Sequence, residues 1–195
     1  MQIDLDLLFT WGAIAKEYNK NEISFHEEES ANFYYQIIDG FVRMFNSNEE
    51  GKEFTQGYFK CGQSFGEPPL SIDETYPSTA VAFKDSKLIK ISKEKFLKIL
   101  DEYPFIQKQF LNLMAERIHT KAKTTKDIVN QKPEFRIIAF LNAHKNPNCA
   151  KKELVEFTRQ EIANFTGLRV ETVIRELSRL SKTDKVEIIN HKLYY

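Results

Sequence analysis

Residues 157–180, FTRQEIANFTGLRVETVIRELSRL, have the pattern of two short helices joined by a tight turn. Thr158 followed by Glu161 is a capping-box pair, in which each side chain bonds a backbone N–H that the first helical turn leaves free. The small side chain of Ala163 allows a second helix to cross close by. Gly167, four residues later, stands where the turn requires a positive φ, which costs glycine little. The segment therefore predicts a helix-turn-helix.

The second predicted helix has two distinct faces. Val173, Leu177 and Leu180 recur at helical spacing and define a buried stripe. The remaining surface carries the candidate base-contacting residues Val170, Glu171, Ile174 and Arg175. Exposed Arg and Glu side chains at the start of such a helix can hydrogen-bond base edges in the major groove of DNA. Two short amphipathic helices can also form an ordinary helical hairpin, but the capped start, the Ala-to-Gly spacing and the exposed Arg/Glu pair together favour DNA binding.

Individual roles follow from position on this helix. Glu171 and Arg175 lie four residues apart, so Glu171 can brace Arg175 as an i,i+4 partner while it accepts from a cytosine amino group. Arg175 would then bond O6 and N7 of a guanine, and Ile174 could contact a thymine methyl group. A simple surface ion pair is the alternative interpretation of Glu171 and Arg175. Phosphate contacts, which fix register without specifying sequence, are expected from Thr158, Gln160 and Arg169.

The distribution of charge agrees with a nucleic-acid partner for the C-terminal part. The chain of 195 residues has a formal net charge of zero, which by itself argues against nucleic-acid binding. Residues 131–195, however, hold 12 Lys/Arg against 8 Asp/Glu, whereas residues 1–130 hold 16 against 20. The positive charge is therefore concentrated in the part that contains the helix-turn-helix pattern.

Composition also predicts the compartment. No apolar run approaches the ~18 residues of a membrane span, and the acidic N-terminus MQIDLDLLF differs from the basic start of a signal peptide. We therefore expect a cytoplasmic protein with no membrane partner. Cys61 and Cys149 are too few for a disulfide framework or a four-thiolate iron–sulfur cluster, and both are expected to be free thiols.

The first 90 or so residues have the pattern of β-structure. Short apolar stretches such as EISF, YYQIIDG, FVRMF and FTQGYF alternate with turn residues, including Asn19-Lys20-Asn21. This pattern favours a sandwich or barrel. The β-α-β alternation that would indicate a nucleotide-binding Rossmann sheet does not occur in the sequence.

Helical periodicity begins at Lys93. SKEKFLKIL predicts a short helix ending near Tyr103-Pro104, and a longer helix is expected from about residue 105 to 129, with Phe110, Met114 and Ile118 on one stripe. A helix of this length gains its stability by packing, either against a second copy in a parallel dimer or against the β-domain. Gln131-Lys132-Pro133 then breaks the helix. The predicted domains are residues 1–103, a β-roll sensor; 104–130, a dimerisation helix; and 131–195, a DNA-binding domain.

The order β-domain, long helix and helix-turn-helix resembles the Crp/Fnr family of bacterial transcription factors, named for the cyclic-AMP receptor protein and the fumarate–nitrate reductase regulator. The resemblance covers nearly the whole chain and is strongest at TRQEIANFTGLRVETVIR. It continues at IIDGFVRMF, at GKEF and at CGQSFGE, residues 61–67, and VEIINHKLYY is similar to the family's closing winged element. The turn Asn190-His191-Lys192 would join its two strands, with Lys192 near the DNA backbone.

The resemblance implies an α+β fold: an N-terminal cyclic-nucleotide-binding-like β-roll (a double-stranded β-helix or jelly roll), a long dimerisation helix and a C-terminal winged helix-turn-helix. It also implies a homodimer on palindromic promoter DNA, with half-sites resembling TGTGA or TTGA, and RNA polymerase as a partner.

The candidate effector pocket departs from the family. In cyclic-AMP-binding members a Gly-Glu pair bonds the ribose and phosphate, and an Arg-Ser pair about ten residues later holds the phosphate. Gly66 and Glu67 match the first pair, but the second is Pro77-Ser78, which lacks the cation and one backbone N–H. The family's Thr-Ser on the long helix is replaced by Lys121 and Ala122. We therefore expect weak or no binding of cyclic AMP, although Ser78, Thr79 and Lys121 could hold another small anion.

Three further interpretations stay open at this point. The β-roll could be a scaffold without a ligand, and the protein would then be a ligand-independent regulator. A cupin-like metal-dependent enzyme would need clustered metal ligands, whereas His26, His119, His144 and His191 are scattered through the sequence. A haem-binding branch would need an axial His, and His26 is instead expected to be a solvated surface residue. No phosphate-binding Gly loop or nucleophile elbow is present, so we predict no catalytic residues, no metal and no enzymatic activity, and no cofactor beyond an unidentified small-molecule effector.

Overall fold

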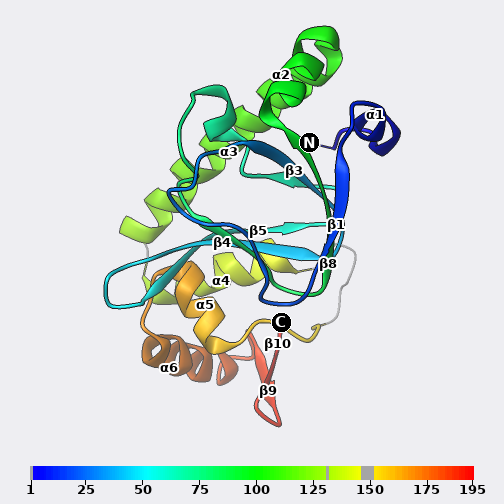
Figure 1. The fold of residues 1–195 in the computed structure, drawn as a ribbon. Helices are drawn as coiled ribbons and strands as arrows, with labels where there is room; N and C mark the ends of the chain where they lie inside the picture. The colour runs from blue at the N-terminus through cyan, green and yellow to red at the C-terminus, as the bar shows by residue number, and fades with distance from the viewer. Residues whose placement is uncertain (1, 131, 146–151) are drawn as a thin grey trace. The chain divides into compact units, whose positions relative to one another are not determined.

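The computed structural model describes residues 2–130, 132–145 and 152–195, and for residues 127–130 it describes the backbone (Figure 1). The chain forms two compact units, Met1–His119 and Thr120–Tyr195, so the boundary between them falls within the long helix. Gln131, the first residue of the expected helix break, and the second thiol, Cys149, lie outside the described residues.

The first unit is built on two four-stranded antiparallel sheets. One has the order β1-β8-β3-β6 and the other β2-β7-β4-β5. Their strands are β1 (Ile14–Tyr18), β2 (Ile23–Phe25), β3 (Phe33–Asp39), β4 (Phe41–Ser47), β5 (Glu53–Lys60), β6 (Ser64–Phe65), β7 (Thr79–Ala82) and β8 (Ser86–Ser92). Each sheet pairs strands from distant parts of the sequence, as in a β-roll, and the predicted fold class is confirmed.

Aromatic side chains fill the core of the β-roll. Phe25 stacks on Tyr76 at 3.7 Å between ring centroids and lies 5.9 Å from Phe65, and Tyr35 stacks on Phe65 at 5.4 Å. All four side chains are buried. Aromatic rings bury large areas of apolar surface, so this cluster contributes much of the stability of the unit.

The N-terminal segment forms a short helix that the sequence analysis did not predict. Helix α1 (Leu5–Thr10) begins at Asp4, whose side chain accepts from the backbone N–H of Leu7. The buried Gln36 side chain fixes the preceding residue, because it accepts from the N–H of Ile3 at 2.8 Å and donates to its carbonyl at 2.9 Å. A helix of six residues is too short to be recognised from sequence periodicity. Its position depends on the tertiary hydrogen bonds of Gln36, which the sequence pattern does not reveal.

Helices α2 (Lys93–Glu102) and α3 (Pro104–Asn130) follow as predicted from the change of period. The Ser92 side chain caps α2, and Pro104 occupies the first turn of α3. The predicted stripe of α3 is not uniformly covered: Phe110 packs against the β-roll core, whereas Ile118 is 72% exposed. Ile106, Phe110 and Arg117 instead form the face that packs on the β-roll.

Besides the end of α3, the second unit contains three helices and a hairpin among its described residues: α4 (Pro133–His144), α5 (Arg159–Thr166), α6 (Val170–Ser181), β9 (Glu187–Ile189) and β10 (Lys192–Tyr194). The sequence analysis assigned no element to residues 133–144; there Pro133 begins α4 at a position where its missing N–H costs nothing. Ile137, Phe140 and Leu141 of α4 are buried. Helices α4, α5 and α6 contact one another, and each contributes buried apolar side chains.

No helix in the described part of the chain is both long and apolar enough to cross a membrane.

Candidate nucleic-acid interface and effector pocket

The capping box that starts α5 is formed as predicted. The Thr158 hydroxyl accepts from the Glu161 N–H at 3.2 Å, and the Glu161 carboxylate accepts from the Thr158 N–H at 2.6 Å. Gly167 ends the helix with a φ of +66°, the left-handed conformation that the turn requires. The direction in which α6 leaves α5 is therefore set by local sequence.

The buried faces of α5 and α6 hold the two helices together. Ile162 and Ala163 of α5 and Val173, Leu177 and Leu180 of α6 are each at most 1% exposed. The backbone of the turn is tied to α4 as well, because Arg136 donates to the Thr166 carbonyl. A rigid scaffold beneath α6 allows its outer face to present side chains in fixed positions.

The outer face of α6 presents most of the predicted base-contacting residues to solvent. Arg169, at the N-cap, and Glu171 are exposed, and Ile174 is 51% exposed. The Arg175 side chain is 73% exposed, whereas Val170 is half-buried. The three exposed base-contacting candidates, Glu171, Ile174 and Arg175, are within one and a half turns of the helix start, where helix-turn-helix proteins contact bases.

The pairing of Arg175 differs from the expectation. Its Nε atom lies 3.8 Å from Oε1 of Glu176, and among the described residues no ion pair joins it to Glu171. Glu176 is partly buried and receives Arg179 on its other oxygen at 3.0 Å, so its carboxylate is held near Arg175. Glu171 is thus left exposed without bracing the arginine.

The predicted phosphate-contacting residues are all exposed to solvent, and two of them also form hydrogen bonds within α5. Thr158 is exposed, and because its oxygen accepts the capping bond, its O–H remains a donor. Gln160 is exposed, and its side-chain N–H donates to Asn164 at 2.7 Å. Arg169 and Lys192 are exposed. Each of these groups can donate a hydrogen bond to an anionic oxygen.

The wing is a two-stranded antiparallel hairpin, as predicted from VEIINHKLYY, but Lys192 begins β10 and is not part of the turn. Its strands β9 and β10 are joined by Asn190 and His191, whose φ values are +47° and +63°. Two consecutive positive φ values are those of a type I′ hairpin turn. Leu193 is buried, which leaves its neighbour Lys192 pointing to the exposed side.

Gly66 and Glu67 of the candidate effector pocket lie at the end of β6, inside the first unit. Gly66 has a φ of +75°, and a Cβ atom there would meet the Phe25 ring at 2.9 Å and the Tyr76 ring at 3.3 Å. Two prolines, Pro68 and Pro69, then form the first turn of η1 (Pro68–Ser71) and supply no backbone N–H. This turn therefore offers an anion fewer donors than an ordinary helical turn.

Glu67 is fully buried and is paired with Arg117 of α3. Nη1 and Nη2 of Arg117 contact the two carboxylate oxygens, the second at 3.1 Å, and Nη2 also donates to the Ser64 carbonyl at 2.7 Å. The guanidinium lies 5.5 Å from the Phe59 ring centroid. Sequence reasoning missed Arg117. One signal could have identified it: Arg117 lies on the same face of the helix as the apolar residues Ile106 and Phe110, which pack on the β-roll.

The remaining candidates are distributed differently. Ser78 is 2% exposed, and the Thr79 hydroxyl accepts from the Glu27 N–H at 3.0 Å. Pro77 stands on the exposed side, where its carbonyl accepts from Asn46 at 2.6 Å. Lys121 is one turn beyond Arg117 on α3 but belongs to the second unit.

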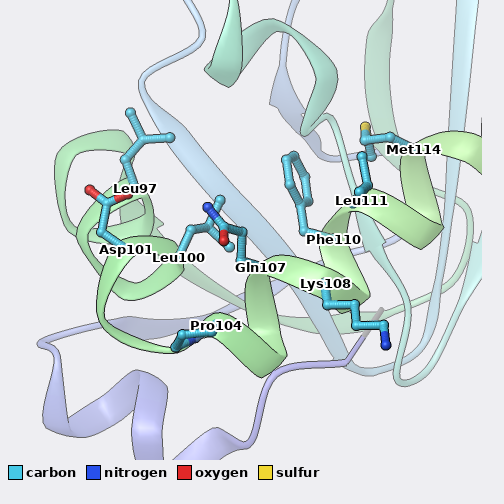
Figure 2. A pocket seen from close by; sticks show the side chains of 9 residues that line it. All are labelled: Leu97, Leu100, Asp101, Pro104, Gln107, Lys108, Phe110, Leu111 and Met114. Carbon is cyan, nitrogen blue, oxygen red and sulfur yellow. The ribbon is translucent and has the colours of Figure 1, made fainter.

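A groove of about 640 Å³ lies between α2 and α3 (Figure 2). Most of its lining is apolar: Leu97, Leu100, Pro104, Phe110, Leu111 and Met114. Asp101, Gln107 and Lys108 complete it. Leu111 in this lining is 66% exposed, and Ile118, seven residues further along α3, is 72% exposed.

Potential metal ligands do not converge in the part of the chain that the structure describes. No group of three or more His, Cys, Asp or Glu side chains is placed to hold an ion there. His26 is exposed, and His144 packs in the α4 core at 4.3 Å from the Phe140 ring. Cys61 is an exposed free thiol.

Comparison with known families matches two parts of the chain. The family described as Cyclic nucleotide-binding domain matches residues 15–103, and the Crp-like helix-turn-helix domain matches residues 135–194. These two matches correspond to the β-roll and to the unit that contains α5, Gly167 and α6.

Relatives align over most of the chain. The cAMP-activated global transcriptional regulator CRP of Salmonella typhimurium is 28% identical over 169 residues, covering 84% of this chain and 80% of the relative. The Anaerobic regulatory protein of Haemophilus influenzae is 25% identical and covers 89% and 69%. The Fumarate and nitrate reduction regulatory protein of Vibrio cholerae is 24% identical and covers 90% and 75%.

Solved structures share the fold at lower identity. The c-di-GMP responsive global regulator CLP of Xanthomonas campestris has a TM-score of 0.84 at 20% identity and covers 97% of this chain and 96% of its own. FixK2 of Bradyrhizobium japonicum has a TM-score of 0.81 at 20% identity, with coverage of 93% and 91%.

Proposed function

The chain belongs to the Crp/Fnr family of bacterial transcription regulators, and we propose that it acts as a homodimeric, sequence-specific regulator that binds palindromic promoter DNA. The observation that carries the proposal is the capped α5, the left-handed Gly167 and the exposed face of α6 in one unit. These features present a helix of suitable length and polarity to a major groove. Since such a regulator acts on the chromosome, the proposal places it in the cytoplasm, with RNA polymerase as a partner at the promoter.

Base contacts are assigned to the outer face of α6. Arg175 is the proposed guanine contact, Glu171 accepts from a cytosine amino group, and Ile174 meets a thymine methyl. Val170 contributes from its half-buried position at the helix start. Because Glu171 is not tied to Arg175, the two residues are free to contact different base pairs. The donors assigned to phosphates are Thr158, Gln160, Arg169 and Lys192.

Dimerisation is assigned to α3. Leu111 is 66% exposed and Ile118 is 72% exposed. Their spacing of seven residues is that of apolar residues at the contact between two paired helices. The groove between α2 and α3 adds apolar surface beside Leu111 (Figure 2). A second copy related by a two-fold axis would cover both surfaces and would set two α6 helices about one DNA turn, roughly 34 Å, apart.

Cyclic AMP is not the proposed effector. One relative is named as cAMP-activated and a structural neighbour as c-di-GMP responsive, so effectors differ among similar proteins. In this chain Pro77 replaces the expected cation, and Pro68 and Pro69 remove backbone donors near Glu67. An effector bound by the first-unit residues Gly66, Glu67, Ser78 and Thr79 would therefore be a different small molecule.

Selection of binding sites from a random DNA library tests the function directly. We expect enrichment of a two-fold symmetric site with TGTGA-like or TTGA-like half-sites and a steep dependence of affinity on salt. Failure to enrich any sequence with the dimeric protein would overturn the proposal. Metal analysis of the same preparation addresses the cupin-like enzyme alternative, which requires a stoichiometric metal.

A further inference from the structure

A chain of ion pairs connects α4 to the proposed guanine contact on α6. Glu134, in the first turn of α4, accepts from Lys185 at 2.9 Å and from Arg179 at 2.5 Å. Arg179 also donates from its Nε to Oε2 of Glu176 at 3.0 Å. The other oxygen of Glu176, Oε1, lies 3.8 Å from Nε of Arg175. All of these residues belong to the second unit, so the base-contacting arginine is linked to the scaffold of its own unit through side chains.

Glu176 has two arginines near it and is paired with only one of them. Its side chain is 15% exposed, and a carboxylate so far removed from water needs a cation or hydrogen-bond donors close to it. Arg179 meets this need at 3.0 Å. Arg175 stays at 3.8 Å, which is beyond hydrogen-bonding distance, and its side chain is 73% exposed. The charge of Glu176 is therefore satisfied by Arg179, and Arg175 is left accessible.

A full ion pair between Glu176 and Arg175 would be unfavourable for DNA binding. Neighbouring residues on an α-helix project about 100° apart, so Glu176 and Arg175 do not share a face. Glu176 lies on the side of α6 where Arg179 meets Glu134 of α4. An arginine bonded to that carboxylate would lie across the surface of α6 toward α4, and its guanidinium would no longer project toward a base.

We propose that Arg179 determines base specificity without contacting a base: it occupies the carboxylate of Glu176 and thereby prevents Glu176 from bonding Arg175. Glu134 holds the Arg179 guanidinium on the side of α6 that faces α4, which is where this role requires it. The inference rests on the proposed function, in which Arg175 contacts a guanine. Arg179 is then a positioning residue that acts through Glu176, and its effect is confined to the base pair that Arg175 contacts.

The test is the ratio of affinities of the full-length protein for the selected DNA site and for the same site with the guanine pair of Arg175 replaced by A·T. Arg179→Met should lower this ratio about two- to fivefold, the range for one partly exposed ion pair that changes its partner. Arg179→Lys keeps a cation beside Glu176 and should stay within about twofold of wild type. The double variant Glu176→Gln/Arg179→Met should restore the ratio, because no carboxylate is left to bond Arg175.

Lys185→Met is the matched control. Lys185 is 54% exposed and Arg179 is 58% exposed, and both bond Glu134, but Lys185 does not reach Glu176. Each substitution removes one positive charge, which weakens binding to all sequences alike. Lys185→Met should therefore lower both affinities and leave their ratio unchanged, so that a change in the ratio reports on the pairing of Glu176 and not on net charge.

Nuclear magnetic resonance of the DNA-free protein tests the pairing by itself. In Arg179→Met the Nε–H signal of Arg175 should shift and exchange more slowly with water, because the group then donates to Glu176, whereas Lys185→Met should leave it unchanged. An unchanged Arg175 signal in Arg179→Met overturns the proposal. So does an unchanged affinity ratio, which would make Arg179 a phosphate contact.

Glu176→Gln alone distinguishes competition from support. The proposal expects a ratio within about twofold of wild type, because Arg179 already occupies the carboxylate that is removed. A clearly lower ratio would show that Glu176 supports the guanine contact of Arg175, and the proposal would be wrong. If wild-type protein prefers no DNA sequence while the Arg175 signal responds as expected, the proposed function fails and the competition for Glu176 is supported.

Discussion

The Nε atom of Arg175 lies 3.8 Å from Oε1 of Glu176, while Arg179 contacts the other oxygen of the same carboxylate at 3.0 Å. Arg179 also donates to Glu134 of α4 at 2.5 Å, so Glu176 and Arg179 belong to a network that ties α6 to its scaffold. Arg175 contacts this network only through Glu176, and the Arg175 side chain is 73% exposed. An exposed ion pair at this distance contributes little, and the arginine can exchange it for a base.

Arg175→Ala should therefore weaken binding to the selected DNA site by ~1–3 kcal/mol and relax the preference at one G·C pair. Arg169→Ala, the matched control, should weaken all sequences alike and reduce the salt dependence, because a phosphate contact carries no sequence information. Repeating the site selection with each variant provides the measurement. An unchanged motif for Arg175→Ala would show that another residue contacts the guanine.

The capping box of α5 gives a prediction about stability. Thr158→Ala removes the hydroxyl that accepts from the Glu161 N–H, and we expect the free energy of unfolding of the second unit to fall by ~1 kcal/mol. Thr158→Ser retains the acceptor and should lose much less. Denaturant unfolding followed by circular dichroism compares the two variants. Equal losses would indicate that the threonine methyl, rather than the cap, is the stabilising group.

Calorimetric titration with cyclic AMP should show weak or no binding. The reason is electrostatic, since the phosphate would meet Pro77 in place of a cation and Pro68 and Pro69 in place of N–H donors. A dissociation constant in the low micromolar range would mean that another cation serves the phosphate, with Lys121 the first residue to substitute.

Local signals in the sequence were sufficient for the DNA-binding segment. The Thr158–Glu161 cap and the φ of Gly167 depend on neighbours within a few residues, and both form as predicted. Ion pairs were harder to predict, because a side chain can choose among several neighbours and tertiary contacts decide which one it meets. The i,i+4 spacing allowed Glu171 to reach Arg175, but the adjacent Glu176 is already fixed by Arg179 and takes that place.

The effector pocket shows the same limit over a longer distance. Gly66 and Glu67 could be identified from a short motif, whereas the partner of Glu67 is 50 residues away on α3. Which face of α3 packs on the β-roll determines that pairing. The stripe of Phe110, Met114 and Ile118 left open whether α3 packs on the β-roll or on a second copy, and Arg117, one residue before the exposed Ile118, was assigned no role.

A two-fold dimer through α3 should sediment with twice the chain mass of 22.9 kDa. Ile118→Glu places a charge in the middle of the proposed seam and should shift the protein toward monomer at micromolar concentration. Glu116→Gln changes charge on the same helix and serves as the control. Wild-type protein that is strictly monomeric, with and without DNA, would refute the α3 assignment.

The carboxylate of Glu134 gives the last prediction, a pH dependence of the second unit. Hydrogen bonds from Lys185 at 2.9 Å and from Arg179 lower the pKa of Glu134 below its ordinary value of 4.5. Because the folded pKa is the lower one, the stabilisation is fully present above about pH 4.5 and is lost as the pH falls through the folded pKa. Glu134→Gln should therefore reduce stability at neutral pH and flatten the acid limb of the stability profile. Glu153→Gln, at a half-buried carboxylate without an ion pair among the described residues, should leave that limb in place. Thermal unfolding from pH 3 to pH 7 separates the variants, and an acid limb that survives Glu134→Gln unchanged would assign the loss of stability to other carboxylates.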